Sequence, residues 1–432
     1  MIDPSHKRRT FLAAMSGALA ASAMSHPAMS LAAGLVKRGS GSRYAPWQPG
    51  MLDIHHITTG SGNAALFIMP DGTSMLVDAG AIYDHDRFAI APRPSAQRRP
   101  GEWIGRYARR HLQRAGRNEI DYFVLSHLHR DHMGEYVAGL PRSKQGDYAL
   151  TGVTDVAEIL PIRHFIDRAY PKYDFPEPLQ GSSNENYVAF IRAQQRLGAD
   201  VQQFSPGSNR QLALLRQPAT FPEFEIRNLY ANGELWAGQG EATKNVFPVS
   251  ALPAVGKPSS DLPSENECSV AFRLRYGKFS YYTGGDLSNN TNFGADPWRD
   301  VESSVALVAG HVDVAVANHH GYVDSMGPVA VRALSPSAFI LMTWDSAHPS
   351  ILALFNMLNK RLYPEERKVF ATAVKPENEV ATRDIAKLAS KNGHVVVRVA
   401  PGGAEYRIEI LDSFNELDTV LSEHGPFLCQ GA

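Results

Sequence analysis

The sequence predicts an α/β fold, and three neighbouring segments carry this prediction. Residues 66–77 contain two short apolar runs around a Pro-Asp-Gly turn signal, which predicts a β-hairpin. Residues 102–115 repeat apolar side chains at helical spacing, with arginine and glutamine between them. Residues 122–125 form an apolar run that predicts a strand. A helix between strands in this order is typical of layered α/β domains.

The rest of the chain gives a partial pattern. A helix is expected at residues 186–197, and a loop rich in proline and serine near residues 246–264. Further strands are expected at residues 269–274, 278–283, 312–317, 338–343, 368–372 and 394–399.

Size and composition describe an ordinary globular protein. The chain has 432 residues, 44% of them hydrophobic and 20% charged, with a formal net charge of -1. This is enough for one large domain or two ordinary ones, and the composition is neither disordered nor fibrous. The charge balance gives no general sign of a nucleic-acid surface, although a local basic patch remains open.

Cys268 and Cys429 lie in no paired motif, which argues against a cysteine zinc cluster. A disulfide between them remains open.

The N-terminus carries a candidate export signal. Arg8 and Arg9 precede a weakly apolar, alanine-rich stretch, and Ala21-Ser22-Ala23 offers a cleavage site. The arrangement resembles a twin-arginine signal, so we expect a periplasmic or secreted protein that meets the twin-arginine export machinery. The alternative is a basic N-terminal end without a sorting role. No apolar run reaches the roughly 20 residues needed to span a bilayer, so no transmembrane segment is expected in the mature protein.

A dense cluster of metal-binding side chains follows the strand at 122–125. The segment 126–135 reads SHLHRDHMGE. His127 and His129 are two residues apart and can reach one ion together, while Asp131 and His132 can reach a second ion. Imidazole and carboxylate suit Zn²⁺, Mn²⁺ or iron. With 16 histidines in 432 residues, an accidental cluster is a poor explanation. The separate pair His55-His56 is interpreted as structural.

The H-x-H-x-D-H pattern after an apolar strand resembles the signature of the metallo-β-lactamase superfamily. The resemblance covers most of residues 51–350 and implies an αββα sandwich of the metallo-β-lactamase fold. It implies that Asp78 supports the ligand loop without coordinating metal. It further implies that Asp286 bridges two metals and that His320, directly before Gly321, is the last ligand.

Two further motifs resemble one branch of this superfamily. Pro70-Asp71-Gly72 and His319-His320-Gly321 are similar to motifs in the hydrolase domains of competence DNA-uptake channels and in bacterial phosphorylcholine esterases. Taken together, these patterns predict an export signal at 1–33, a linker at 34–48, a hydrolase domain at 49–412 and a C-terminal tail at 413–432.

The chain departs from the pattern at one ligand. Typical β-lactamase-like members place a third histidine for the first metal a short distance before the bridging aspartate, but residues 265–269 contain none. Asn266 is the nearest match and would support the site from outside the ligand set, so the first metal would hold His127, His129, Asp286 and water. Cys268 is expected to face the core. This departure argues against a true β-lactamase.

The resemblance implies hydrolysis by water activated between two divalent ions, most simply Zn²⁺, with Mn²⁺ or iron as alternatives. Asp131 and His319 are the expected catalytic side chains, with His319 contacting substrate or donating a proton. Tyr322, Asp324 and Ser325 are weaker candidates, and His348 is expected at the surface or behind a ligand. Loops at 83–101, 171–186 and 236–264 are expected to shape the pocket.

We expect a small-molecule ester or phosphodiester as substrate, and three other interpretations remain. A nuclease-like activity on DNA would need a basic surface, for which the arginines between residues 98 and 114 are the candidates. A metal-binding protein without turnover would be favoured by loss of Asp131, His132, Asp286 or His320, and all four are present. A di-iron redox protein would carry an acidic residue in the histidine motif and a flavin domain, and neither is evident.

Overall fold

The computed structural model describes residues 36–38, 41–83 and 88–431. Their elements all belong to one compact unit, Gly34–Ala432. The expected export signal at 1–33 lies outside the described residues. Among the described residues, no helix has both the length and the apolar character needed to cross a membrane.

The first sheet has ten strands, and its order places the C-terminal strand β16 beside the N-terminal strand β2. The order is β1-β18-β17-β16-β2-β3-β4-β5-β6-β7. Pairing is antiparallel from β1 to β4 and parallel from β4 to β7. The strands are β1 (Val36–Arg38), β2 (Leu52–His56), β3 (Ala65–Ile68), β4 (Ser74–Val77), β5 (Ile120–Val124), β6 (Ile162–Asp167), β7 (Asp200–Gln203), β16 (His394–Val399), β17 (Glu405–Leu411) and β18 (Val420–Leu428).

The second sheet has eight strands in the order β10-β9-β8-β11-β12-β13-β14-β15. It is antiparallel from β10 to β12 and parallel from β12 to β15. The strands are β8 (Phe224–Ala231), β9 (Glu234–Trp236), β10 (Thr243–Asn245), β11 (Ala271–Tyr276), β12 (Phe279–Thr283), β13 (Val314–Val316), β14 (Ala338–Leu341) and β15 (Lys368–Ala371).

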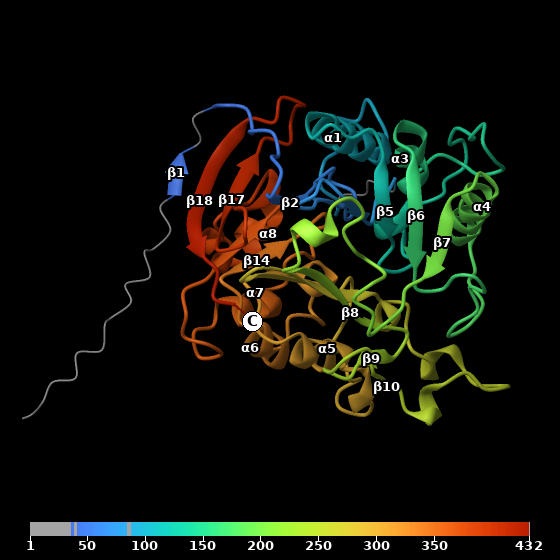
Figure 1. Ribbon diagram of the computed structural model, residues 1–432. Helices are drawn as coiled ribbons and strands as arrows, with labels where there is room; N and C mark the ends of the chain where they lie inside the picture. Colours follow the sequence, from blue (N-terminus) through green and yellow to red (C-terminus); the bar gives the residue numbers. More distant parts are fainter. Residues whose placement is uncertain (1–35, 39–40, 84–87, 432) are drawn as a thin grey trace, which may run out of the picture. The chain divides into compact units, whose positions relative to one another are not determined.

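Three apolar clusters stack these sheets into four layers. One cluster lies between the sheets and joins residues such as Phe67 and Val397 to Phe272 and Ile340. A second packs the first sheet against α1 (Pro100–Arg114), α3 (Val153–Ile159) and α4 (Ser182–Arg196). A third packs the second sheet against α5 (Val301–Ala309), α6 (Pro328–Leu334) and α7 (Ile351–Leu358). In Figure 1, α1 and α3 accordingly lie on the opposite side of the sheets from α5 and α6. The predicted αββα sandwich is confirmed.

Most expected elements form close to their predicted positions. The hairpin at 66–77 is β3 and β4, and the helix at 102–115 is α1, which begins earlier because Pro100 fits the first turn of a helix. The helix expected at 186–197 is α4, and the later expected strands are β11 to β16.

The two ends of the domain differ from the prediction. The residues expected as a C-terminal tail contain β18, which pairs with β17 along most of its length. The residues expected as a linker contain β1, which pairs with β18, and the buried side chain of Tyr44. Both segments are therefore corrected to parts of the first sheet and its outer face. Cys268 and Cys429 are free and buried in different clusters, with Cys268 in the core as expected.

Candidate metal centre

The predicted ligands meet where strands from both sheets end. β5 leads through Ser126 into His127, His129 and the short helix α2 (Arg130–Met133), which carries Asp131 and His132. From the second sheet, β12 leads to Asp286 and β13 to the turn at 318–321. Side chains at the ends of neighbouring strands can therefore converge on one point.

The ligand atoms form two groups that share one carboxylate. Asp131, His132, Asp286 and His320 bring one atom each within 4.8 Å of one another, and so do His127, His129 and Asp286. These are the two sets expected from the sequence. The shared member is Asp286, as expected for a carboxylate that serves two ions.

The group of Asp131, His132, Asp286 and His320 is closely packed and buried. His320 Nε2 lies 3.0 Å from Asp131 Oδ2 and 3.4 Å from Asp286 Oδ2. His132 Nε2 lies 3.3 Å from each of the same two oxygens. In the group shared with His127 and His129, His127 Nε2 lies 3.1 Å from His129 Nδ1 and 3.7 Å from Asp286 Oδ2. His129 is the most accessible member.

The donor atoms fit metal ions better than they fit each other. His132 Nε2 and Asp286 Oδ1 are buried and have no hydrogen-bond partner among the described residues. The opposite ring nitrogens are held, because His132 Nδ1 lies 2.7 Å from Asp78 Oδ2 and His320 Nδ1 lies 2.9 Å from the Met342 carbonyl oxygen. With Nδ1 donating, each ring directs Nε2 toward the shared carboxylate, and loss of the Nε2 proton would give the tautomer that a metal requires. The residues present therefore fit a pair of divalent cations.

Electrostatics in the site favour added positive charge. Burial opposes a charged His132, but attraction to Asp286, Asp131 and Asp78 outweighs it and raises the pKa of His132 well above its usual range. Burial likewise opposes a charged His320, but attraction to Asp286 outweighs it and raises the pKa of His320 to about 10. Burial opposes ionised Asp286, yet the surrounding histidines hold its pKa well below its usual range. A bound cation would replace the charged histidines in stabilising the ionised Asp286, and its binding would release the histidine protons.

Asp78 supports the ligand loop as expected. Its Oδ1 accepts a hydrogen bond from the Ser126 backbone N–H at 2.7 Å, and its Oδ2 accepts from the Ser126 hydroxyl at 2.8 Å. Oδ2 also accepts from His132 Nδ1. Asp78 has φ 60, a left-handed conformation that aims the carboxylate back at the loop. Loop and ligand ring are therefore fixed by one side chain.

The paired histidines have different surroundings. His319 and His320 have φ 46 and φ 54, so both occupy the left-handed region and their side chains diverge. His320 is buried among the ligands, whereas the His319 side chain is 17% exposed. His319 Nδ1 lies 2.7 Å from Asp324 Oδ1, and its Nε2 lies 3.8 Å from Asp286 Oδ2. His320 therefore lies among the other predicted ligands, and His319 lies at the rim.

The residues with weaker predictions surround this rim. Asn266 Nδ2 lies 3.3 Å from His319 Nε2, and Asn266 Oδ1 is buried without a partner among the described residues. His348 is buried and stacks on His320 with ring centroids 4.7 Å apart, so it lies behind a ligand. Tyr322 contacts His319 and His348, whereas the Ser325 hydroxyl donates to the Tyr322 carbonyl oxygen. None of these side chains belongs to either ligand group.

Sequence reasoning missed two polar features that hold the ligand segments: the Arg168–Glu265 ion pair and the buried Glu302. Arg168, at the end of β6, is fully buried and ion-paired with Glu265. Glu265 Oε1 also accepts the backbone N–H of Leu128, between the first two ligands, at 2.7 Å. On the other side, Glu302 of α5 accepts hydrogen bonds from Asn318 Nδ2 and from the backbone N–H of Met326. No local sequence signal marks either residue, because their partners are distant in the chain.

A cavity of about 530 Å³ opens beside the centre. Its walls include His129 and Asp131, and the residues facing them are Gln180, Ser182, Ser183 and Asn184. These belong to the expected pocket loop at 171–186 and the start of α4. No described residue of the loops at 83–101 or 236–264 lines this cavity. The cavity gives a polar space next to the ligands that a small substrate could enter.

Fold and site together define an αββα sandwich with buried histidine and carboxylate ligand atoms at the edge where strands of its two sheets end. Neither a family model nor a curated protein matches the sequence. Among solved structures, the chain is similar to a mutant of CmlA β-hydroxylase, with 12% identity, a TM-score of 0.37, and coverage of 82% of this chain and 54% of that one. The chain thus spans about half the length of that protein.

Two smaller proteins are also similar in structure. One is a HARLDQ-motif mutant of a metallo-β-lactamase from Cronobacter sakazakii, with 13% identity, a TM-score of 0.28, and coverage of 61% of this chain and 73% of that one. The other is a diphosphatase of the PhnP family, with 11% identity, a TM-score of 0.28, and coverage of 67% of this chain and 85% of that one. These identities and TM-scores are too low to indicate a function, so we infer the function from this chain's own residues.

Proposed function

We propose that this protein is an exported, metal-dependent hydrolase of the metallo-β-lactamase superfamily that acts on a small ester or phosphodiester. The observation that carries the proposal is Asp286, a buried carboxylate shared by two groups of ligand atoms. Histidine and carboxylate ligands favour Zn²⁺, with Mn²⁺ or iron as alternatives.

The ligands divide the work between two cations. His127, His129 and Asp286 would hold the first, and Asp131, His132, Asp286 and His320 the second. When bound, such a pair supplies a Lewis acid and a water molecule activated as a nucleophile. The first group has fewer protein ligands and lies beside the accessible His129, so substrate is expected to approach there.

In this proposal, His319 protonates the leaving group. Asp324 accepts a hydrogen bond from its Nδ1, which orients the ring and stabilises the imidazolium form. Its Nε2 points toward the ligand carboxylate from the partly exposed rim. A positioned imidazolium can protonate a leaving oxygen, which is general acid catalysis.

The arrangement of charges gives no support to the nuclease interpretation. Arg106 of α1 is ion-paired with Glu416, and Arg110 is ion-paired with Glu416 and Asp418. Arg99, just before the helix, is paired with Asp155. These guanidinium groups are ion-paired within the fold, so they are less available to contact DNA.

A substrate panel tests the proposed reaction. The purified, zinc-loaded protein would be assayed with bis(4-nitrophenyl) phosphate, 4-nitrophenyl phosphorylcholine, a lactone and a β-lactam. We expect turnover of an ester or phosphodiester, none of the β-lactam, and loss of turnover in Asp286→Asn. Metal binding without turnover of any substrate would contradict the hydrolase and favour a non-catalytic metal protein.

The export proposal rests on the twin arginines alone. Arg8→Lys together with Arg9→Lys should keep the protein in the cytoplasm in folded, active form, because folded cargo depends on this pair for export. Fractionation with an activity assay checks this. Normal appearance of the double variant outside the cytoplasm would contradict it.

A further inference from the structure

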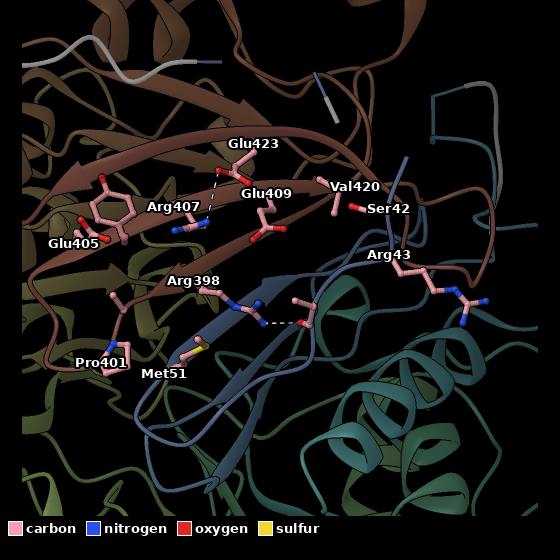
Figure 2. Close-up of a pocket in the computed structure, with 13 residues that line it drawn as sticks. Ser42, Arg43, Met51, Arg398, Pro401, Glu405, Arg407, Glu409, Val420 and Glu423 are labelled. Atoms are coloured by element: carbon pink, nitrogen blue, oxygen red, sulfur yellow. Dashed lines mark hydrogen bonds and ion pairs between the residues drawn. The ribbon is translucent and has the colours of Figure 1, made fainter. Parts of the chain in front are cut away.

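A second cavity lies on the outer face of the first sheet, at β16, β17 and β18. Its volume is about 420 Å³, and it shares no lining residue with the metal ligands. No helix residue lines this cavity; the chain segment 42–51 borders it instead. Figure 2 shows Arg398 and Glu409 on the strands beneath it, with Met51 on the opposite wall.

Glu409 is the unusual residue of this cavity. It is only 7% exposed, yet its carboxylate has no hydrogen bond or ion pair within the described ranges. Its neighbours across the strands are Val396 on β16 and Glu423 on β18, and neither can neutralise it. The side chain is largely withdrawn from water, which disfavours its charged form, and its carboxylate has no partner among the described residues that would compensate.

The nearby cations are occupied elsewhere. Arg398 binds the Asp53 carboxylate through two hydrogen bonds of 2.8 and 2.6 Å and also donates to the Ala45 carbonyl oxygen. Arg407 is ion-paired with Glu423 at 3.6 Å, the dashed contact in Figure 2. Arg43 is exposed, and in Figure 2 its side chain points away from Glu409. Glu405, also in the lining, adds negative charge.

The remaining walls are apolar. Met51, Pro401 and Val420 line the cavity together with two alanines. The cavity therefore combines one unpaired carboxylate with an apolar surface large enough for a short alkyl chain.

We propose that this cavity binds a small organic cation, with an ammonium group on Glu409 and an alkyl portion against Met51, Pro401 and Val420. The ammonium supplies the counter-charge that the fold does not, and the alkyl part removes apolar surface from water. The site is independent of the metal centre, so its test does not depend on the proposed hydrolase.

Binding should be linked to a proton. Burial raises the pKa of Glu409, opposed by Arg398 and Arg407 and assisted by Glu423 and Asp53. A bound ammonium favours the ionised carboxylate, so affinity should fall when acid protonates Glu409, at a pH above the usual range for glutamate.

Calorimetric titration of the metal-loaded full-length protein with n-hexylammonium chloride tests the proposal, with 1-hexanol as the neutral probe. Glu409→Gln keeps the side-chain shape and removes the charge, and Glu366→Gln makes the same change in an exposed ion pair outside the cavity. We expect saturable binding of the ammonium that is weakened about ten- to a hundredfold by Glu409→Gln and unchanged by Glu366→Gln. Hexanol should bind correspondingly more weakly than the ammonium.

Two further results would be decisive. Thermal unfolding of Glu409→Gln without ligand should show no loss of stability, because the substitution removes a buried unpaired charge. If this variant fails to fold, the pH dependence of ammonium binding to the unmodified protein replaces it. Absence of saturable binding at millimolar ammonium, equal binding by Glu409→Gln, or affinity independent of pH across the titration of Glu409 would each overturn the proposal.

Discussion

At the scale of single residues, two of the proposed ligand histidines are held through the ring nitrogen that faces away from the other ligands. His132 is held by Asp78 and His320 by the Met342 carbonyl oxygen, and both present Nε2 to Asp286. Such orientation from outside the ligand set stabilises metal binding without touching the metal.

Asp131→Ala and His132→Ala should each empty the second cation site. Either change removes one of four converging donors, and the cation should leave because the remaining set is too weak. Elemental analysis should give about one metal ion fewer per chain. His164→Ala, a change at a partly exposed histidine on β6, is the matched control. Unchanged metal content in both ligand variants would show that this assignment is wrong.

His319→Ala and His320→Ala should fail in different ways. His320→Ala removes a buried ligand, so metal, activity and some stability should be lost together, since bound metal stabilises only the folded state. His319→Ala should keep its metal and lose turnover by roughly 10²–10⁴-fold, as expected for a general acid.

Metal content measured beside the rate separates these two outcomes. Loss of metal in His319→Ala alone would exchange the two roles. Retention of metal in both variants would place the last ligand elsewhere.

The sequence predicts ligands well where they are local and poorly where they depend on tertiary contact. His127 to His132 lie in one short loop after one strand, so their spacing alone shows that they can converge. Arg168 and Glu265 are far apart in the chain, and only the fold brings the guanidinium to the carboxylate behind Leu128. Glu409 could not be noticed either, because its lack of a partner is a property of the assembled sheet.

At the scale of elements, the Arg168–Glu265 pair joins the end of β6 to the segment before β11, and Glu265 also holds the loop after β5 through Leu128. Glu265→Gln would leave a fully buried guanidinium without a counter-charge, which should destabilise the fold by about 3–5 kcal/mol. It should also weaken metal binding, because the Leu128 backbone loses its charged acceptor.

Denaturant unfolding and metal affinity check this prediction. Glu119→Gln, which removes a partly exposed carboxylate that pairs with Arg163, is the control and should destabilise the fold much less. Equal costs in the two variants would contradict a structural role for the buried pair.

A cluster of buried histidines joins α1 to the first sheet. His55 of β2 and His111 of α1 have ring centroids 4.5 Å apart, and Tyr107 lies 4.6 Å from the ring of His394 on β16. Burial, then nearby Arg110, lowers the pKa of His394 to about 3, and burial also lowers the pKa of His55 and His111.

These depressed pKa values predict an acid-labile interface. The unfolded chain binds more protons than the folded chain below about pH 6.5, so this stability is present above that pH and is lost as pH falls toward 3. His394→Asn removes one such group, and its amide oxygen can still accept from the Thr58 backbone N–H. Its free energy of unfolding should fall less steeply between pH 7.5 and pH 4.5 than that of the unmodified protein. Identical slopes would contradict this interpretation.

At the same scale, strands with clear boundaries were predicted and the last strands were not. Residues 420–428 show no alternation and contain Gly425-Pro426, a turn signal, yet they form β18 because the edge of β17 is free to pair. Pairing with a partner strand overrides weak local preference, so the sequence indicated a tail where the structure has a sheet.

At the scale of the whole molecule, the four-layer order follows from the apolar patterns, but the location of the site depends on the meeting of the two sheets. The motif at 126–135 and the aspartate at 286 come from different sheets and converge only because β5 and β12 end at the same edge. The family resemblance supplied this convergence as an expectation; composition and spacing alone would have left the second half of the site open.

The central claim is that two cations share Asp286 and that hydrolysis depends on both. It is tested most directly by removing metal with a chelator and then titrating zinc back while metal content and phosphodiester hydrolysis are measured on the same samples. The account predicts negligible turnover without metal and full recovery at about two equivalents per chain, with Asp286→Asn failing to recover. Undiminished hydrolysis in the metal-free protein, or saturation without any bound zinc, would contradict it.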